Sequence, residues 1–561
     1  MLQIRCKNIN VTKSFPEGTS LLDVYQEFAD EIKLPYPIVS AKVNNASEGL
    51  KFRLYQNRDV EFLDAREGSG HRVYVRSLCF VLYKATQDLF PGSKLFIEHT
   101  ISRGYYCNFK KRSALPTSPQ GGGTVSEADV EQIRQRMQEI INLDMPFRRT
   151  EATTEEAIRV FAERGFTDKV KLLETSGQIY SDYYMLGDTA DYYYGPLVPS
   201  AGYLTVWGLE PFHDGMLLRV PDWNDPTRLA EKVDMPKTFG MFAEKTRWDI
   251  IMRLSNAGDV NKAILKGHAS ELIQVSEALQ EKKIVKIAEE IATRAPKLVL
   301  ITGPSSSGKT TFCKRLSVQL LACGLRPMSI STDDYFVNRV DTPKLPNGDY
   351  DFDNIETVEY HLLEDHLLRL MNGERVEVPE YNFITGKREW NGKKLRLQSD
   401  SVLIVEGIHA LNPLLTSKIP DELKYKIYIS ALTSISLDDH NWIPPRDNRL
   451  LRRIIRDYNK GAFTARETIG QWKNVCEAED HWIFPYQETA DVMFNSALNI
   501  EFAVLRTHAE IILTSVPKNC PEYAEARRLL KFIHYFIPVS DKEIPPTSIM
   551  REFVGGSSFK Y

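Results

Sequence analysis

The stretch Gly303-Pro-Ser-Ser-Ser-Gly-Lys-Thr310 decides how the C-terminal half of this 561-residue chain folds. It matches the pattern G-x-x-x-x-G-K-[ST] at every fixed position. The residues before it, Lys297-Leu-Val-Leu-Ile-Thr302, are apolar and rich in branched side chains, which is typical of a buried strand. The residues after it, 311–323, have helical character. The sequence therefore predicts a strand, a glycine-rich loop and a helix in direct succession.

This loop is expected to hold the phosphates of ATP. Its glycines allow the backbone to fold so that successive N–H groups and the helix N-terminus face an anion. We expect Lys309 to reach the β- and γ-phosphates and the Thr310 hydroxyl to bind Mg²⁺. The predicted ATP contacts are Gly303, Ser305, Ser306, Ser307, Gly308, Lys309, Thr310 and Thr311. The alternative is an ordinary glycine turn that binds no ligand.

Length and composition indicate a multidomain protein with a cytoplasmic location. A chain of 561 residues is too long for one hydrophobic core. The formal net charge is −4, so no global field attracts nucleic acid, and an RNA contact would need a local basic patch. No apolar run reaches the length of a membrane span, and we expect no membrane partner. The seven scattered cysteines suit reduced thiols.

The pattern along the chain divides it into five segments. These are 1–66 and 67–225, both α+β; 226–294, a mainly helical connector; 295–510, an α/β domain; and 511–561, a helix and tail of unassigned role. Five strands are predicted in the α/β domain: Leu298–Thr302, Met328–Thr332, Val402–Glu406, Lys426–Ser430 and Asp491–Phe494. Because strands and helices alternate, we expect a parallel sheet with helices on both faces. The apolar stripe within 261–294 is expected to pack between domains.

The N-terminal segment resembles the TGS domain, a ubiquitin-like module of threonyl-tRNA synthetase and certain GTPases. The resemblance depends on a predicted hairpin at the start of the chain and on Phe15-Pro-Glu-Gly-Thr-Ser-Leu-Leu-Asp-Val24. Residues 67–225 resemble the additional, editing-type domain that follows TGS in that synthetase, through the stretches 89–95 and 191–203. The resemblance implies two tRNA-enzyme modules in front of the α/β domain.

The second domain departs from that family at its metal site. The family has a tetrad with metal-ligand spacing, H-x-x-x-H on a helix and C-x-x-x-H in a loop. The matching residues here are Arg76, Phe80, Tyr193 and Leu197. The resemblance therefore implies a fold without the metal or the editing chemistry. An alternative is a rebuilt site, for which the candidate residues are His71, His99, Cys107 and His213.

Two further features of this domain allow more than one interpretation. Glycines and prolines within 116–126 predict a flexible loop. The tyrosines at 180, 183, 184 and 192–194 could stack on RNA bases or fill a half-buried sheet. If the tyrosines stack on RNA bases, residues 1–225 are expected to contact RNA or the ribosome.

After residue 296 the motifs resemble the uridine kinase and phosphoribulokinase family over about 200 residues. Ser331-Thr-Asp-Asp-Tyr-Phe-Val337 follows the second strand, and the resemblance assigns the catalytic carboxylate to Asp334. Such a group accepts the proton of a substrate hydroxyl. The competing functional hypothesis is that Asp333 or Asp334 binds the metal. The alternative without a function is that the carboxylate only caps the end of the strand. Asp353 matches the carboxylate that binds the ribose diol in the family.

The same resemblance supplies the rest of the substrate and metal sites. Tyr381 matches the tyrosine that packs on the nucleoside, and Arg388 is retained, but the base-reading histidine of the family is Gly386 here. Glu406, at the end of the strand Val402–Glu406, is expected to order Mg²⁺ together with Thr310. His409 is expected to be structural rather than catalytic.

An arginine-rich helix follows, and the family places it over the phosphates as a lid. Arg449, Arg452, Arg453 and Arg456 lie on two faces of this helix, so one face can meet polyphosphate while the other meets water. Arg453 and Arg456 match the catalytic arginine pair of the family. Arg453 also matches the arginine that contacts the substrate. The Arg-Gly-Arg that follows in uridine kinases is Gly461-Ala-Phe463 here. A solvated basic helix without a ligand is the alternative.

The resemblance implies an ATP- and Mg²⁺-dependent phosphotransferase that acts on a small-molecule hydroxyl, most plausibly the 5′-hydroxyl of a nucleoside. A second hypothesis is a regulatory ATPase whose front domains bind RNA or the ribosome. A third is a kinase for another sugar-like metabolite, suggested by Gly386 and Phe463. Asp334 and Asp353 favour an enzyme, since a switch that only hydrolyses ATP needs no ribose-binding carboxylate.

Overall fold

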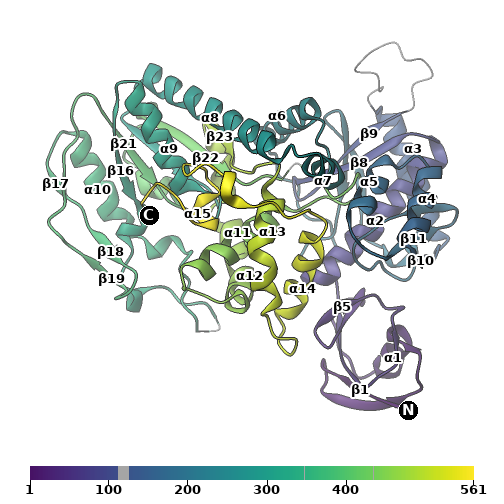
Figure 1. Cartoon of the computed structure of the whole chain (residues 1–561). Coiled ribbons are helices and arrows are strands. Elements are labelled where there is room, and N and C mark those ends of the chain that lie inside the picture. The colour runs from purple at the N-terminus through teal and green to yellow at the C-terminus, as the bar shows by residue number, and fades with distance from the viewer. Residues whose placement is uncertain (112–124, 347, 434, 561) are drawn as a thin grey trace, which may run out of the picture.

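The computed structural model of the chain describes residues 1–111, 125–346, 348–433 and 435–560. Figure 1 shows the N-terminal domain at one end of the molecule, the second domain next to it and the large C-terminal half beyond. The predicted loop over 116–126 falls, up to residue 124, outside the described residues. None of the helices in the described ranges is long and apolar enough to cross a membrane.

The N-terminal domain is a mixed sheet covered by one helix. In spatial order its strands are β2 (Val11–Phe15), β1 (Leu2–Cys6), β7 (Arg58–Leu63), β4 (Ser40–Val43) and β5 (Ala46–Glu48), with β3 (Thr19–Ser20) paired to β6 (Arg53–Leu54). Strand β1 pairs antiparallel with β2, as the predicted hairpin requires, and parallel with β7. Helix α1 (Leu21–Phe28) begins at a capping box between Ser20 and Asp23. Its buried face, Leu21, Val24 and Phe28, completes the core.

The second domain surrounds one long helix, α2 (Gly68–Leu89), which is buried along most of its length. Its antiparallel sheets are β13 (Gly208–Phe212), β14 (Gly215–Arg219), β9 (Gly104–Lys110) and β8 (Lys94–Ile101), and β10 (Phe147–Thr153), β11 (Tyr180–Leu186) and β12 (Thr189–Asp191). Three more helices complete it: α3 (Glu127–Asn142), α4 (Thr154–Glu163) and α5 (Thr167–Thr175). Of the six clustered tyrosines only Tyr180 is exposed, so the others fill the sheet and its surroundings rather than offering rings to RNA.

The connector contains three helices: α6 (Pro236–Met252), α7 (Ala257–Leu265) and α8 (Ala269–Arg294). The apolar stripe of α8 is divided between two cores. Leu272 lies between domains, as the sequence predicted, in the core that the second domain shares with the C-terminal helices. Ile284, Ile287 and Ile291 pack instead on Phe312 and Leu316 of α9 (Lys309–Ala322), within the C-terminal half. Helix α8 therefore belongs to the core of that half (Figure 1).

The C-terminal half is built on the predicted parallel sheet. In spatial order its strands are β16 (Arg326–Ser331), β21 (Ser401–Glu406), β15 (Leu298–Thr302), β22 (Lys424–Ser430) and β23 (Val492–Asn495). Every neighbouring pair is parallel. Alternate residues of β15 face opposite sides, Val299 and Ile301 toward α9, Leu298 and Leu300 toward α10 (Tyr360–Met371). The carboxyl ends of β15, β16 and β21 therefore meet at one edge, where parallel sheets bind ligands.

Small hairpins and C-terminal helices complete this half. The pairs are β17 (Val376–Glu377) with β20 (Lys394–Leu395), and β18 (Glu380–Asn382) with β19 (Lys387–Glu389). The helices are α11 (Pro445–Asn459), α12 (Ala465–Trp482), α13 (Glu501–Thr514), α14 (Tyr523–Ile533) and α15 (Arg551–Val554). One hydrophobic core joins α11 and α13 to Leu172 and Tyr192 of the second domain. The second domain is thus packed directly against the helix that carries the predicted lid arginines.

Candidate active site

The phosphate loop has the conformation that the motif requires. It connects β15 to α9, and two residues adopt positive φ, Ser306 at 60° and Gly308 at 87°. Gly303 is required by packing, because a Cβ there would lie 2.0 Å from the carbonyl oxygen of Ile429 in β22. The hydroxyls of Ser306 and Ser307 are buried and have no hydrogen-bond partner among the residues that the structure describes. Buried donors without partners at the start of a helix suit a polyphosphate ligand, so the loop fits ATP.

Lys309 is the first residue of α9, and its side chain folds back onto the phosphate loop. Its Nζ donates to the carbonyl oxygens of Gly303, at 2.9 Å, and Pro304, at 3.1 Å. Burial lowers the pKa of this ammonium, and the carboxylates of Glu406, Asp333 and Glu552 act against that shift. The lysine is therefore a cation at the centre of an acidic cluster, ready to turn toward a phosphate.

Thr310 and Glu406 form a pair of oxygen ligands next to the loop. The Thr310 hydroxyl donates to Glu406 Oε1 over 3.2 Å. Burial and the neighbouring Asp333 carboxylate together raise the pKa of Glu406 to about 7, against the opposing effect of the Lys309 cation. A hydroxyl and a carboxylate whose charge lacks compensation are ligands that Mg²⁺ prefers. These two residues thus fit the cation that the sequence assigned to them.

The carboxylate that faces the phosphate loop is that of Asp333. Both Asp333 and Asp334 lie in a short 3-10 turn (Thr332–Tyr335) that follows β16. Burial raises the pKa of Asp333, and the Lys309 and Arg456 cations lower it. Asp334 instead accepts a hydrogen bond from the Tyr381 backbone N–H, at 3.4 Å, and burial raises its pKa while the Lys393 cation lowers it. The catalytic role of Asp334 stays a prediction, and Asp333 is a second candidate for that role.

Asp353 lies in the same acidic cluster. Burial raises its pKa to about 6, the Arg453 guanidinium lowers it, and the Asp333 carboxylate is among the charges that raise it. His409 is buried beside the backbone of residues 353 and 354. Burial lowers the pKa of His409 to about 4, so the ring is neutral. Asp333 and Asp353 thus belong to one site, as a phosphate acceptor between them would require.

The arginines of α11 separate into two kinds. Arg449 and Arg452 are fully buried and are paired with Glu479 of α12 and Glu501 of α13. Neither meets water, so the prediction of a solvated face is wrong for this helix. Arg453 donates to the Ser305 hydroxyl, at 3.1 Å, and Arg456 to its neighbour Asp457 at 2.9 Å. Arg449 and Arg452 also touch the phosphate loop, because they donate to the carbonyl oxygens of Ser305, at 3.1 Å, and Ser306, at 3.3 Å. The two arginines predicted to act on phosphate, Arg453 and Arg456, differ from them in being only half-buried.

Glu479 is a loop contact that the sequence did not reveal. Its Oε1 accepts from the backbone N–H of Ser305, at 3.0 Å, while its Oε2 accepts from Arg449 at 2.7 Å. Its position in the last turn of α12, far from any motif, gives no local signal for this role. The pair fixes the phosphate loop to the lid helix.

The β18–β19 hairpin forms the wall on the substrate side. Tyr381 and Arg388 are directly paired across the hairpin. The Tyr381 ring packs on Phe336, with the centroids 5.5 Å apart, while one terminal nitrogen of Arg388 is buried without a partner. At Gly386, with φ 68°, a Cβ would lie 2.9 Å from Arg339 Cβ. Arg339 therefore covers the position at which the family has its base-reading histidine.

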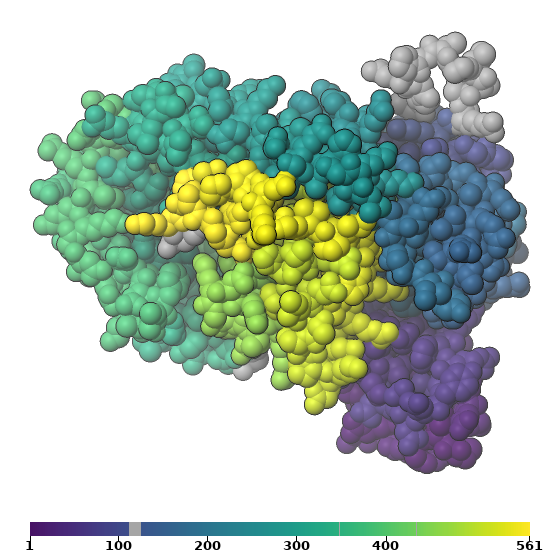
Figure 2. Space-filling model, in the orientation of Figure 1, coloured from purple at the N-terminus to yellow at the C-terminus, as the bar shows by residue number. Residues whose placement is uncertain are grey.

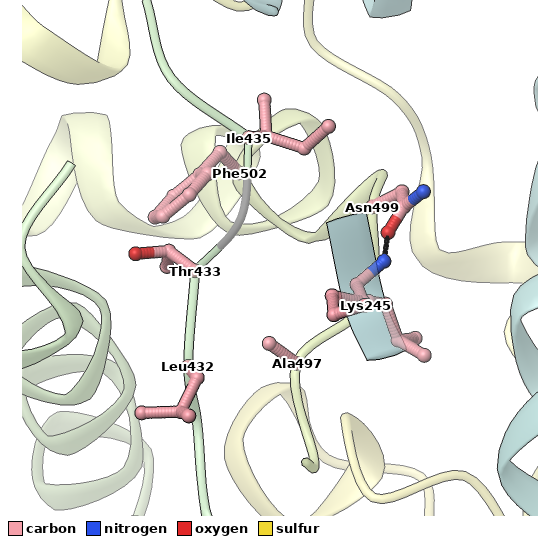
Figure 3. A pocket seen from close by; sticks show the side chains of 8 residues that line it. Lys245, Leu432, Thr433, Ile435, Ala497, Asn499 and Phe502 are labelled. Atoms are coloured by element: carbon pink, nitrogen blue, oxygen red, sulfur yellow. Dashed lines mark hydrogen bonds between the residues drawn. The ribbon is translucent and has the colours of Figure 1, made fainter. Parts of the chain in front are cut away.

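Two small hollows lie away from this site. One, of about 10 Å³, lies between Lys245 of α6 and residues that follow β22 and β23, and has room for about one water. Figure 3 shows Lys245 reaching Asn499 beside this hollow. The other, of about 80 Å³, is lined by α6, α8 and the end of β23. Neither is lined by the phosphate loop.

In the second domain the residues at the four tetrad positions are all buried. Phe80 and Tyr193 are in ring contact at 5.7 Å, and Arg76 and Leu197 are buried with them. The alternative histidines each stack on a different aromatic side chain, His71 on Trp223, His99 on Phe242 and His213 on Phe239. Within the ranges that the structure describes, no group of three or more His, Cys, Asp or Glu side chains could hold a metal ion.

Comparison with known proteins finds similarity to a kinase family in the C-terminal half. Residues 298–501 match the family described as Phosphoribulokinase / Uridine kinase family. The matched residues include the phosphate loop and the five strands of the parallel sheet. A uridine kinase of Ureaplasma parvum is 27% identical over 201 residues, which are 36% of this chain and 88% of that protein. These similarities support a phosphotransferase that uses ATP.

The chain is also similar to threonine–tRNA ligases. That of Syntrophomonas wolfei is 31% identical over 205 residues, or 36% of this chain. The chain spans about 30% of the length of that ligase. Among solved structures, D-glycerate 3-kinase from Cryptococcus neoformans matches with a TM-score of 0.27 and 15% identity, covering 38% of this chain and 92% of that one.

Proposed function

We propose that the protein transfers the γ-phosphate of ATP to a hydroxyl of a small molecule, with the 5′-hydroxyl of a nucleoside as the first candidate. The observation that carries the proposal is the position of Asp333 in one charged cluster with Lys309 of the phosphate loop and with Asp353. Phosphoryl transfer requires mainly positioning and charge neutralisation, and a carboxylate near the transferred phosphate can take the proton of the attacking hydroxyl.

Each residue of the cluster then has a defined task. Asp333 accepts the hydroxyl proton, while Lys309, Arg453 and Arg456 neutralise the charge that develops on the phosphate. Asp353 accepts hydrogen bonds from neighbouring hydroxyls of the acceptor, and Tyr381 and Arg388 form the wall beside it. Thr310 and Glu406 would hold Mg²⁺, which supplies positive charge to the phosphates when bound.

Arg339 favours a second candidate, an acceptor other than a pyrimidine nucleoside. Its side chain covers Gly386, where the family's base-reading residue would stand. A guanidinium in that place suits an acceptor with a carbonyl, carboxylate or phosphate oxygen rather than one particular base edge. A sugar-like metabolite with such a group is therefore the alternative substrate class.

The deciding experiment is a panel of nucleosides and sugars, incubated with the purified protein and γ-labelled ATP. We expect label on at least one acceptor, and none with the Lys309→Ala variant. Label released only to water would contradict the kinase proposal and favour the regulatory ATPase. A contact of residues 1–225 with RNA or the ribosome stays a separate proposal, tested by pull-down of ribosomes with the full-length protein.

A further inference from the structure

The C-terminal end of the chain lies on the phosphate loop. Figure 2 shows it as a band across the surface of the kinase half, between the connector helices and the helices that follow the sheet. We call residues 544–555 the C-terminal strap. It contains α15, and its apolar residues Ile549 and Phe553 are buried in the same core as Phe312 of α9 and Ile429 of β22. The strap is therefore packed as part of the fold and not simply resting on its surface.

Two strap residues contact the nucleotide-binding elements directly. Glu552 Oε2 accepts a hydrogen bond from the Thr311 hydroxyl, at 2.6 Å, and from the Thr311 backbone N–H at 3.3 Å. Ile549 lies against Gly308, so closely that a Cβ on that glycine would be 2.4 Å from Ile549 Cγ2. The Glu552 charge also acts on the pKa values of Lys309 and Glu406. The strap thus places a carboxylate inside the site.

The strap is fixed by contacts on both sides. The Arg452 guanidinium of α11 lies 4.8 Å from the centre of the Phe553 ring, and Asn459 Nδ2 donates to the Phe553 carbonyl at 3.0 Å. On the other side the Ser548 hydroxyl donates to Glu277 of α8. These anchors come from the lid helix and from the helix that covers α9. Movement of either helix would therefore move the strap.

The chemistry of the contact conflicts with a bound triphosphate. Thr311 is the third residue of α9, so its N–H is one of the helix N-terminal donors that attract an anion. In this structure that anion is the Glu552 carboxylate. A phosphate at the same donors would replace it, because two negative groups cannot share them in a partly buried site.

We propose that the C-terminal strap is an autoinhibitory segment, in which Glu552 occupies a phosphate position of the nucleotide site and must leave when ATP binds. This inference rests on the proposed function, since it takes ATP as the ligand. If ATP binds only molecules in which the strap is open, its apparent dissociation constant equals the intrinsic one divided by the open fraction. If the strap is closed about 90% of the time, the apparent dissociation constant for ATP is about tenfold higher than for the open protein.

The test compares full-length variants by equilibrium binding of a fluorescent ATP analogue in the presence of Mg²⁺. Glu552→Gln keeps the shape of the side chain and removes its charge, and Glu543→Gln changes an exposed glutamate of the same tail as a control. We expect Glu552→Gln to bind the analogue about tenfold more tightly than wild type, and Glu543→Gln to bind like wild type. Ile549→Ala, which loosens the strap through packing, should shift affinity in the same direction.

Hydrogen exchange gives an independent readout. Saturating ATP should increase exchange of backbone amides in 544–555 of the wild-type protein. Equal affinity of wild type and Glu552→Gln, or unchanged exchange in the strap with ATP bound, would overturn the proposal. Weaker binding by Glu552→Gln would also overturn it, because the carboxylate would then assist the nucleotide or its metal. Binding that depends on Glu552 without transfer to any acceptor would support the strap while refuting the kinase proposal.

Discussion

Asp333 lies within the electrostatic reach of Lys309, while its neighbour Asp334 is bound to the backbone of the β18–β19 hairpin. The two carboxylates therefore serve different parts of the structure although they are adjacent in the chain. We expect Asp333 to take part in the chemistry, whereas Asp334 connects the β18–β19 hairpin to the turn after β16. This division gives the sharpest test of the site.

Exchange of each aspartate for asparagine should separate these roles. Asp333→Asn removes the proton acceptor and should lower kcat by about 100- to 10,000-fold. Asp334→Asn retains an oxygen that can accept from the Tyr381 N–H, so kcat should change by less than about tenfold while the acceptor KM rises. Steady-state kinetics on the acceptor found in the panel measures both. A larger loss of kcat in Asp334→Asn than in Asp333→Asn would return the catalytic role to Asp334.

Asp353 should give the acceptor KM a dependence on pH. Its pKa is raised to about 6, so the carboxylate that accepts hydrogen bonds from hydroxyls is lost as pH falls through that value. We expect the acceptor KM to rise below about pH 6 in the wild-type enzyme. In Asp353→Asn the KM should be about 10- to 100-fold higher and nearly independent of pH between 5 and 8. A wild-type KM that stays flat across this range would remove Asp353 from the acceptor site.

Glu406 should lower stability at neutral pH unless Mg²⁺ is present. Its pKa is about 7 in the folded protein and 4.5 ordinarily, so the folded state binds more protons between these values and stability falls as pH rises through them. Glu406→Gln should therefore melt at a higher temperature than wild type at pH 8, with little difference at pH 4.5. Added Mg²⁺ should stabilise wild type more than the variant. Equal stabilisation of both by Mg²⁺ would place the cation elsewhere.

Lys169 should hold the second domain to the kinase half. Its ammonium is completely buried between Asp191 of its own domain, at 3.0 Å, and Asp438 of the kinase half, at 2.9 Å. Removing one partner of a buried charge network leaves the others unpaired, so Lys169→Met should lower the free energy of unfolding by about 3–5 kcal/mol. Lys171→Met breaks a half-exposed pair with Asp259 and should cost less than about 1 kcal/mol. Urea unfolding followed by tryptophan fluorescence compares them, and equal losses would contradict the network's role.

Arg449 and Arg453 lie in the same helix, but we expect the first to support the stability of the fold and the second to support activity. Arg453→Ala removes a cation next to the Ser305 hydroxyl and should lower kcat by about 100-fold with an unchanged melting temperature. Arg449→Ala leaves Glu479 buried without its partner and should destabilise the fold by about 3–5 kcal/mol. Thermal unfolding and steady-state kinetics of both variants give the comparison. A stable, fully active Arg449→Ala protein would show that the buried pair is dispensable.

The sequence predicts those parts of the fold and site that local patterns determine. The phosphate loop between β15 and α9, the five parallel strands and the pair Thr310–Glu406 follow from short motifs and their spacing, but the spatial order of the strands was not predicted. Which of Asp333 and Asp334 faces the phosphate loop cannot be predicted from such motifs, because it depends on the direction in which a four-residue turn leaves β16. Glu479 and Glu552 were missed because each reaches the loop from more than 150 residues away, and no periodicity records such a contact.

The packing of α8 on α9 affects how the protein can be divided. The similarity to kinases begins at residue 298, but a fragment that starts there would lack α8 and expose the side of α9 that carries Phe312 and Leu316. It would also leave Asp438 without Lys169. Such a fragment is expected to aggregate on expression. Biochemical work on the kinase half alone should therefore retain the chain from the second domain onward, so that the lysine and the helix both remain in place.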